Sequence, residues 1–251
     1  MPPLSAANGS GGASLPFKQR SPRLKETLRL EEVVGEFVSA SNLTLLATDS
    51  AGKRWVYKAT EAMSPLWDFD AKTLPARELA TYLVSEALGF GVVPETVWSK
   101  GPLGTGSAQR FIDVDPDFNP RPLFVPEVSE KLWPVAVLDV VCNNADRKLG
   151  HLLTEKQTGR IFAIDNGLTF HSEPKLRTVL WGLAEKPLPE AMIHALDRLG
   201  RALDRQLAKD LMTLVTKPEL EAFRQRLDDL ASTGVHPLPP EDRPPVPWPV
   251  W

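Results

Sequence analysis

Cysteine and histidine are scarce in this chain of 251 residues, which has one cysteine, Cys142, and four histidines. A single cysteine excludes an internal disulfide and any multi-cysteine metal site. The histidines show neither the H-E-x-x-H motif nor another paired spacing that binds zinc. We therefore expect neither a disulfide-stabilised fold nor a zinc enzyme.

Long apolar runs and an excess of one charge are also missing. No run approaches the roughly 18–20 apolar residues that a membrane-spanning helix needs, and the first residues (MPPLSAANGSGGASLPF) lack the apolar core of a signal peptide. Lysine and arginine number 29 against 32 aspartates and glutamates, and a net charge of −3 does not indicate a nucleic-acid-binding surface. We expect a cytoplasmic protein without a membrane span or a nucleic-acid partner, and we favour a monomer.

Three common enzyme motifs are absent as well. The chain has no GK[ST] Walker motif and no G-x-S-x-G nucleophile elbow, since GTGSAQ has the wrong spacing. The glycine-rich GPLGTG is followed by no helical pattern, so it predicts a hairpin turn rather than a dinucleotide-binding fingerprint. These absences exclude three frequent routes to nucleotide binding or hydrolysis.

The two ends differ in composition from the rest of the chain. Residues 1–24 are rich in Gly, Ser, Pro and Ala, and we expect a disordered arm, partly basic, whose role the sequence leaves open. Residues 236–251 hold seven prolines and two tryptophans, a pattern that predicts an extended tail. Because Trp248 and Trp251 are costly to expose to water, we expect this tail to pack on the body of the protein.

The first half of the remaining sequence predicts a sheet with one helix. The helix is expected over 76–88, capped by Gly89, because Leu79, Leu83 and Ala87 share one face. Short runs of β-forming residues predict strands at 33–39, 43–48, 54–59, 92–99 and 107–114. We therefore expect an antiparallel-sheet lobe over 25–111.

The second half is mainly helical in pattern. Helices are expected over 132–142 and 190–214, and a last helix is expected after the capping box that joins Thr216 to Glu219. A short hairpin is expected between 152–153 and 160–164. The fold class is therefore α+β, with a sheet-rich lobe followed by a mainly helical lobe over 112–235.

The polar cluster NNADRKLGH and the later string IDNGLTF carry the chemistry. They supply Asp146, a residue able to bind metal five positions later (His151), and Asp165 after an apolar strand. Phosphoryl transfer needs one carboxylate to orient the attacking hydroxyl and further ligands to hold a metal ion on the phosphates. Lys58 in WVYK and Glu78 in ARELA supply a strand lysine and a helix carboxylate, which in kinases brace the phosphates.

These strings resemble the phosphatidylinositol 3-/4-kinase-like superfamily, particularly its type II 4-kinases, which carry an N-x-D-R core and an IDNG element. Flanking strings such as PLWDFD, ARELA and KLRTVLW resemble a bacterial branch that we associate with actinobacteria. The resemblance covers about Leu30 to Trp251. It implies a two-lobed protein-kinase-like fold that binds ATP with Mg²⁺ or Mn²⁺.

The resemblance also implies roles for particular residues. Asp146 would be the catalytic carboxylate, supported by Arg147, and Asp165 would be the principal metal ligand. Lys58 would contact the phosphates with Glu78 as its partner. The remaining contacts to the nucleotide would come from a phosphate-binding turn and a hinge, namely Ser39, Ser41 and Asn42, and Gln109, Arg110 and Phe111.

The sequence departs from the family pattern at one position that matters for chemistry. His151 stands where related kinases place a metal-binding asparagine, and imidazole suits softer divalent ions better than Mg²⁺. Either the site favours Mn²⁺, or Asp165 alone holds a metal firmly, or catalysis is weak. A hydrogen-bonded structural histidine is the plainer interpretation of His151.

Each site residue also has a plainer interpretation. Asp146 would be a surface ion pair, Asp165 a turn residue, Lys58 an ordinary strand lysine and Glu78 a solvated helix residue. The combined order of the four favours an ATP-dependent phosphotransferase whose hydroxyl acceptor, a protein or a small molecule rather than a lipid, is unidentified. The alternatives are a nucleotide-binding pseudokinase, or a nucleotidyltransferase on the same fold.

Overall fold

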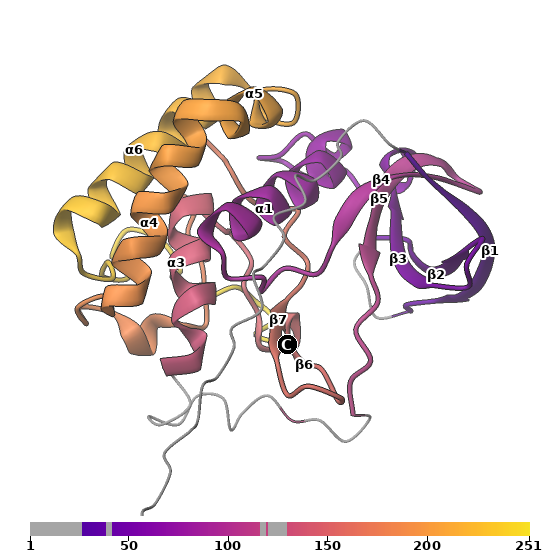
Figure 1. Ribbon diagram of the computed structural model, residues 1–251, viewed down its shortest axis with the longest axis horizontal. Coiled ribbons are helices and arrows are strands. Elements are labelled where there is room, and N and C mark those ends of the chain that lie inside the picture. The colour runs from indigo at the N-terminus through magenta and orange to yellow at the C-terminus, as the bar shows by residue number, and fades with distance from the viewer. Residues whose placement is uncertain (1–26, 39–41, 116–118, 120–129) are drawn as a thin grey trace, which may run out of the picture.

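The computed structural model describes residues 27–38, 42–115, 119 and 130–251. A strand-rich lobe and a helical lobe lie side by side, and helix α1 (Leu74–Leu88) runs between them (Figure 1). No helix in the described part of the chain is both long and apolar enough to span a bilayer.

The first lobe is a five-stranded barrel, closed in the order β1-β2-β3-β5-β4. Four pairings are antiparallel, as expected, and the barrel is closed by a short parallel pairing of β1 with β4 that the sequence did not predict. Alternation in β3 buries Trp55, Tyr57 and Ala59 in a small core of its own. The strands are β1 (Leu28–Glu36), β2 (Thr44–Asp49), β3 (Arg54–Ala59), β4 (Thr96–Gly101) and β5 (Gly104–Arg110).

The close approach of β3 and β5 depends on Gly106. A Cβ atom at this position would lie 2.1 Å from the backbone oxygen of Lys58. Any side chain in place of Gly106 would therefore push the two strands apart beside Lys58, the lysine that is predicted to contact the phosphates.

Helix α1 ends at Gly89 as its sequence predicts and begins two residues earlier than expected, at Leu74. Pro75 occupies the first turn, where its missing N–H costs nothing, and Gly89 ends the helix in the left-handed conformation with φ 73°. Its buried face includes Leu79 and Leu83, which belong to the large core shared with the helical lobe. This packing fixes where α1 presents Glu78.

The helical lobe forms around that large core. Its helices are α3 (Trp133–Cys142), α4 (Glu190–Ala202), α5 (Ala208–Leu211) and α6 (Lys217–Thr233), and its hairpin is β6 (Leu152–Thr154) with β7 (Ile161–Ala163). Cys142 is fully buried in this core as a small apolar side chain. The capping box is present, because the Glu219 carboxylate accepts a hydrogen bond from the Thr216 backbone N–H over 2.8 Å.

Several sequence expectations are wrong in detail. The strand expected over 33–39 spans Leu28–Glu36, and the strand expected over 107–114 spans Gly104–Arg110. The single helix expected over 190–214 is interrupted by a wider π-type turn over Leu203–Leu207, in which Arg205 has φ −111° and ψ −110°. The apolar stripe continues through the interruption because Leu203, Leu207 and Leu211 are all buried. Periodicity alone therefore did not reveal it. The strand expected over 92–99 begins later, at Thr96.

The proline-rich tail returns to the helical lobe and ends beside the β6–β7 hairpin (Figure 1). The Pro245 carbonyl accepts hydrogen bonds from the Thr178 backbone N–H and the Trp181 indole, and the Val250 carbonyl accepts one from the Leu149 N–H over 2.9 Å. The expectation that packing would cover Trp248 is wrong, since this residue is 88% exposed. The backbone carbonyls of Pro245 and Val250 thus hold the tail to the helical lobe.

Candidate active site

Lys58 joins three elements of the fold at one point. Its Nζ atom lies 2.6 Å from Glu78 Oε1 on α1 and 2.7 Å from Asp165 Oδ1, just after β7. Glu78 is buried, and its second carboxylate oxygen accepts a hydrogen bond from the Asn166 backbone N–H over 3.0 Å. The lysine, the helix carboxylate and the aspartate predicted from the sequence are thus brought together.

The charges of this cluster support one another. Burial alone would lower the pKa of Lys58, but the carboxylates of Asp165 and Glu78 outweigh it and raise that pKa above its ordinary value. Partial desolvation opposes ionisation of the half-exposed Asp165, and the positive charge of Lys58 overcomes it and holds the pKa of this aspartate below its usual range. Lys58 is therefore an ammonium group and Asp165 a carboxylate at neutral pH.

Asp165 stands in a backbone conformation that aspartate tolerates better than most residues. Its φ is 56°, in the left-handed region, and its side chain is 48% exposed. This conformation at the end of β7 leaves the side chain accessible, while Asn166 turns back into the protein and is fully buried. The IDNG string therefore places one accessible carboxylate beside one structural amide.

Asp146 lies in the loop that follows α3. Asn143 ends that helix in the left-handed conformation, and the Asn144 side chain accepts a hydrogen bond from the Asp146 N–H over 2.9 Å. The Asp146 carboxylate contacts Lys148 Nζ at 2.9 Å. Burial raises the pKa of Asp146 above its ordinary value despite this lysine. A carboxylate with a raised pKa is a better proton acceptor than an exposed one.

Arg147 has a supporting position and does not face the cluster of Lys58 and Asp165. It is fully buried and forms a two-pronged ion pair with Asp139 of α3, with one contact at 2.9 Å. Its remaining donors reach the Ile164 carbonyl over 2.7 Å and the Asn166 side chain over 2.6 Å. Arg147 therefore joins the loop of Asp146 to the loop of Asp165, and these contacts suit a residue that positions both loops.

The predicted phosphate-binding turn lies only partly within the described structure. Ser39 and Ser41 fall outside the described residues. Asn42 is described, and its side-chain oxygen accepts a hydrogen bond from the Ser64 backbone N–H over 2.7 Å. This contact ties the start of β2 to the segment that precedes α1.

The predicted hinge residues belong to the barrel. Gln109 is buried within β5 and donates from its side chain to Thr96 Oγ1 over 3.0 Å. The backbone N–H groups of Arg110 and Phe111 donate to the carbonyls of Glu95 and Arg54. These two N–H groups are therefore already engaged, and a hinge that meets adenine would have to follow them in the chain.

His151, just before β6 of the helical lobe, contacts Asp165. Its Nε2 atom lies 3.4 Å from Asp165 Oδ2, the oxygen that Lys58 does not hold. Burial lowers the pKa of His151 to about 4, so that the ring is neutral and its nitrogen lone pair is available. One ion bonded to both atoms at about 2.1 Å would span such a separation, so these residues fit a divalent cation.

In the described part of the chain, Asp165 and His151 form a pair of ligands without a third acidic, histidine or cysteine side chain. Within the described ranges no group of three or more His, Cys, Asp or Glu side chains could bind a metal. Divalent ions of this type usually keep several water or phosphate oxygens in kinase sites. Asp165 and His151 would thus be the protein part of a coordination shell that a phosphate-bearing ligand completes.

Sequence reasoning missed Lys148 and the buried network behind the site. Lys148 follows Asp146 by two residues, and this spacing is the signal that could have indicated it. Asp139 gave no signal, because a carboxylate within an apolar helix is explained only when Arg147 is seen beside it. Contacts between residues far apart in the chain cannot be read from local patterns.

Comparison with known proteins finds a matching family model and a relative in sequence. The sequence model described as phosphatidylinositol 3- and 4-kinase matches residues 73–224. Protein Rv2133c of Mycobacterium tuberculosis is 37% identical over 256 residues, a match that covers 87% of this chain and 91% of that protein.

Solved kinase structures share the fold. The Golgi casein kinase superposes with a TM-score of 0.56 at 16% identity, over 82% of this chain and 72% of that one. Its structure with Mn/ADP bound gives a TM-score of 0.53 at 14% identity, with the same coverage. The proinflammatory kinase CtkA of Helicobacter pylori gives 0.53 at 12% identity, over 84% of this chain and 95% of that one.

The fold is therefore kinase-like, and the family match includes Glu78, the loop of Asp146 and the loop of Asp165. With more than half of the chain matched, and with a relative of this identity over most of its length, the chain belongs to the phosphatidylinositol 3- and 4-kinase family.

Proposed function

We propose that this protein is an ATP-dependent phosphotransferase that moves the γ-phosphoryl group to a hydroxyl acceptor. The observation that carries the proposal is the position of Lys58 between Glu78 and Asp165, at 2.6 Å and 2.7 Å. In kinases a strand lysine held by a helix carboxylate braces the phosphates, and the nearby aspartate holds the metal. A purely structural ion pair would not need a second, half-exposed carboxylate.

The nucleotide would lie between the two lobes. Lys58 would contact the α- and β-phosphates, and the turn of Ser39, Ser41 and Asn42 would offer polar groups to the phosphates. Because the N–H groups of Arg110 and Phe111 are engaged in the barrel, we place the adenine contact just beyond them, at 112–113. The Mn/ADP complex of the Golgi casein kinase supports a nucleotide and a divalent ion on this fold.

The divalent cation would be held by Asp165 and His151. When bound, it supplies charge neutralisation to the phosphate oxygens. Asp165 offers the oxygen that Mg²⁺ and Mn²⁺ prefer, whereas His151 offers a nitrogen that favours the softer of the two.

Asp146 and Lys148 would act on the reacting groups. Asp146 would accept the proton of the acceptor hydroxyl as its oxygen bonds to the γ-phosphorus and the bond to the ADP oxygen breaks. Lys148, 2.9 Å from Asp146, would offer a positive charge to the transferring phosphoryl group. The acceptor is proposed to be a protein or a small soluble molecule, because the sequence lacks the cysteine cluster by which type II 4-kinases are lipidated.

The test is nucleotide turnover with ATP labelled in the γ- or the α-phosphate, in the presence of Mg²⁺ or Mn²⁺. We expect release or transfer of the γ-label. Substitution Asp146→Asn should reduce it about 100-fold or more, because it removes the proton acceptor and preserves the shape. Asp165→Asn should also reduce the transfer of the γ-label, because it weakens the binding of the divalent cation.

Two other outcomes would replace the proposal. Transfer of the α-label would show a nucleotidyltransferase. ATP-dependent thermal stabilisation with neither label moving, across a panel of protein and small-molecule acceptors, would favour a nucleotide sensor. Glu221→Gln on the exposed face of α6 serves as a matched control that should leave turnover unchanged.

A further inference from the structure

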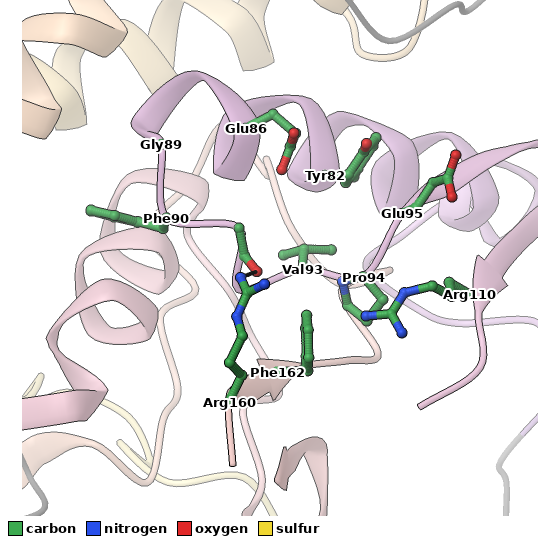
Figure 2. A pocket seen from close by; sticks show the side chains of 11 residues that line it. Tyr82, Glu86, Gly89, Phe90, Val93, Pro94, Glu95, Arg110, Arg160 and Phe162 are labelled. Carbon is green, nitrogen blue, oxygen red and sulfur yellow. Dashed lines mark hydrogen bonds between the residues drawn. The ribbon is translucent and has the colours of Figure 1, made fainter. Parts of the chain in front are cut away.

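One cavity lies apart from the cluster of Lys58, Asp165 and His151. It has a volume of about 250 Å³ and is formed by the end of α1, the residues that lead into β4, the end of β5 and strand β7 (Figure 2). Arg110 of the predicted hinge lines it, whereas none of the predicted metal or catalytic residues does. A cavity of this size accommodates a small metabolite but is too small for a nucleotide triphosphate.

One wall of the cavity is acidic. Tyr82 and Glu86 project from one face of α1, one turn apart, and Glu95 stands beside them (Figure 2). Glu95 is paired with Lys53 at 2.7 Å, whereas neither the Glu86 carboxylate nor the Tyr82 hydroxyl has a hydrogen-bond partner among the described residues. Burial raises the pKa of Glu86, so a donor brought by a ligand would offset a real desolvation cost.

The opposite wall is basic and aromatic. The guanidinium groups of Arg110 and Arg160 lie 5.0 Å and 5.2 Å from the centre of the buried Phe162 ring. Arg110 is paired with Glu155 at 2.9 Å, and Arg160 donates to the Gly91 carbonyl over 3.0 Å. Each guanidinium has five N–H donors, so both keep donors for an anionic group.

Two walls of opposite charge across a small cavity suit a ligand that carries both charges. A purely cationic ligand would meet the two arginines, and a purely anionic one would meet Glu86. We propose that this cavity binds a small zwitterion, a free α-amino acid, with its ammonium group on Glu86 and its carboxylate on Arg110 and Arg160. The apolar surface of Phe162, Val93 and Pro94 would contact the side chain of the ligand.

Helix α1 and strand β7 connect this cavity to the proposed active site. Helix α1 carries Glu86 at one end and Glu78 two turns earlier, and β7 carries Phe162 three residues before Asp165. A ligand here would therefore bind between the elements that position Lys58 and the metal. The binding itself does not depend on the proposed phosphotransfer.

The experiment is calorimetric titration of the full chain with the free amino acids at millimolar concentration, together with the N-acetyl and amide derivatives of any that bind. We expect at least one amino acid to bind and both derivatives to bind at least tenfold more weakly, since each lacks one of the two charges. Glu86→Gln and Arg160→Gln should each weaken binding about tenfold or more, as expected for a lost charged hydrogen bond. Glu221→Gln should bind as the unaltered protein does.

Three results would overturn the inference: no binding of any amino acid, equal binding of the blocked derivatives, or unchanged affinity in Glu86→Gln. Thermal unfolding of the variants without ligand shows whether they are folded. The titration measures no turnover, so a failure to bind amino acids would not contradict the proposed phosphotransferase activity. A failure to turn over ATP would likewise not contradict the amino-acid site.

Discussion

Lys58 holds Glu78 of α1 and Asp165 at once, and this gives its substitution two separate consequences. The Lys58→Met variant should lose about 100-fold in ATP turnover, since the phosphates lose their lysine. It should also lose about 3 kcal/mol of stability, because the buried Glu78 carboxylate loses its ion-pair partner.

Both effects of Lys58→Met can be measured on the same sample, by labelled-ATP turnover and by thermal unfolding. Lys100→Met, at an exposed position of β4, is the matched control and should change neither. Full turnover in Lys58→Met would show that the ion-pair cluster is structural only.

His151 offers a test of metal choice at the scale of one side chain. The His151→Asn variant replaces a nitrogen ligand by the oxygen ligand of related kinases. We expect the ratio of Mg²⁺-supported to Mn²⁺-supported turnover to rise about tenfold, because Mg²⁺ prefers oxygen. The measurement is the initial rate at matched concentrations of each ion, and an unchanged ratio would mean that His151 is not a ligand.

Among the residues of the site, the sequence identified those whose chemistry is visible locally. Lys58, Glu78 and Asp165 lie at their expected places because a strand, a helix and a short hairpin each have a clear pattern. The supporting role of Arg147 was predicted from the family resemblance, but its partners Asp139 and Asn166 were not, since they come from two other segments of the chain. The hinge at Gln109, Arg110 and Phe111 stays a prediction, and the sequence did not reveal that the N–H groups of Arg110 and Phe111 donate to the carbonyls of Glu95 and Arg54.

At the scale of elements, an ion pair between Arg77 of α1 and Glu219 of α6 connects the two helices. The arginine is buried, and it donates to Glu219 over 2.6 Å and to the Thr169 carbonyl over 2.6 Å. Substitution Arg77→Met leaves the capping carboxylate of α6 largely buried without its cation, at a cost of about 3 kcal/mol. The melting temperature should then fall by roughly 6–12 °C for a chain of this size.

The matched control is Arg201→Met, at an exposed position of α4 where the arginine pairs with Asp197. An exposed pair of this kind contributes about 0–1 kcal/mol, so this variant should melt close to the unaltered protein. Equal melting temperatures for the two variants would contradict the claim that Arg77 stabilises the packing of α1 against α6.

Element boundaries were predictable where a local signal marks them. Gly89 ends α1, and the Thr216–Glu219 box opens α6, because both depend on residues adjacent in the chain. The π-type turn at Leu203–Leu207 and the parallel closure of the barrel depend on packing against distant segments. Neither has a local signature, so neither was predicted.

At the scale of the whole molecule, His236 joins the tail to the helical lobe. It is 1% exposed and packs edge to face against Trp133 and Trp181, with ring centres 6.1 Å and 5.8 Å away. Burial lowers the pKa of His236 below 6.5, against the smaller opposing effect of the Pro237 carbonyl. The folded state therefore binds fewer protons than the unfolded state near this pH.

The stability provided by the neutral His236 is present above pH 6.5 and is lost as the pH falls through and below that value. Unfolding by urea at about pH 7.5 and about pH 5.5 should therefore show a lower free energy of unfolding at the acid value. In the His236→Gln variant, which cannot titrate, this difference should shrink. An identical pH dependence in both proteins would contradict the buried neutral histidine.

The central claim concerns the molecule as a kinase, and the rate of γ-phosphoryl loss from ATP in the presence of Mn²⁺ tests it most directly. The comparison is between the unaltered protein and Asp146→Asn, at saturating nucleotide and with the acceptor panel present. We predict γ-label transfer or release that falls about 100-fold or more in the variant, while ATP binding is retained. Equal rates in the two proteins, or no γ-label movement in either, would contradict the assignment of Asp146 and with it the phosphotransferase.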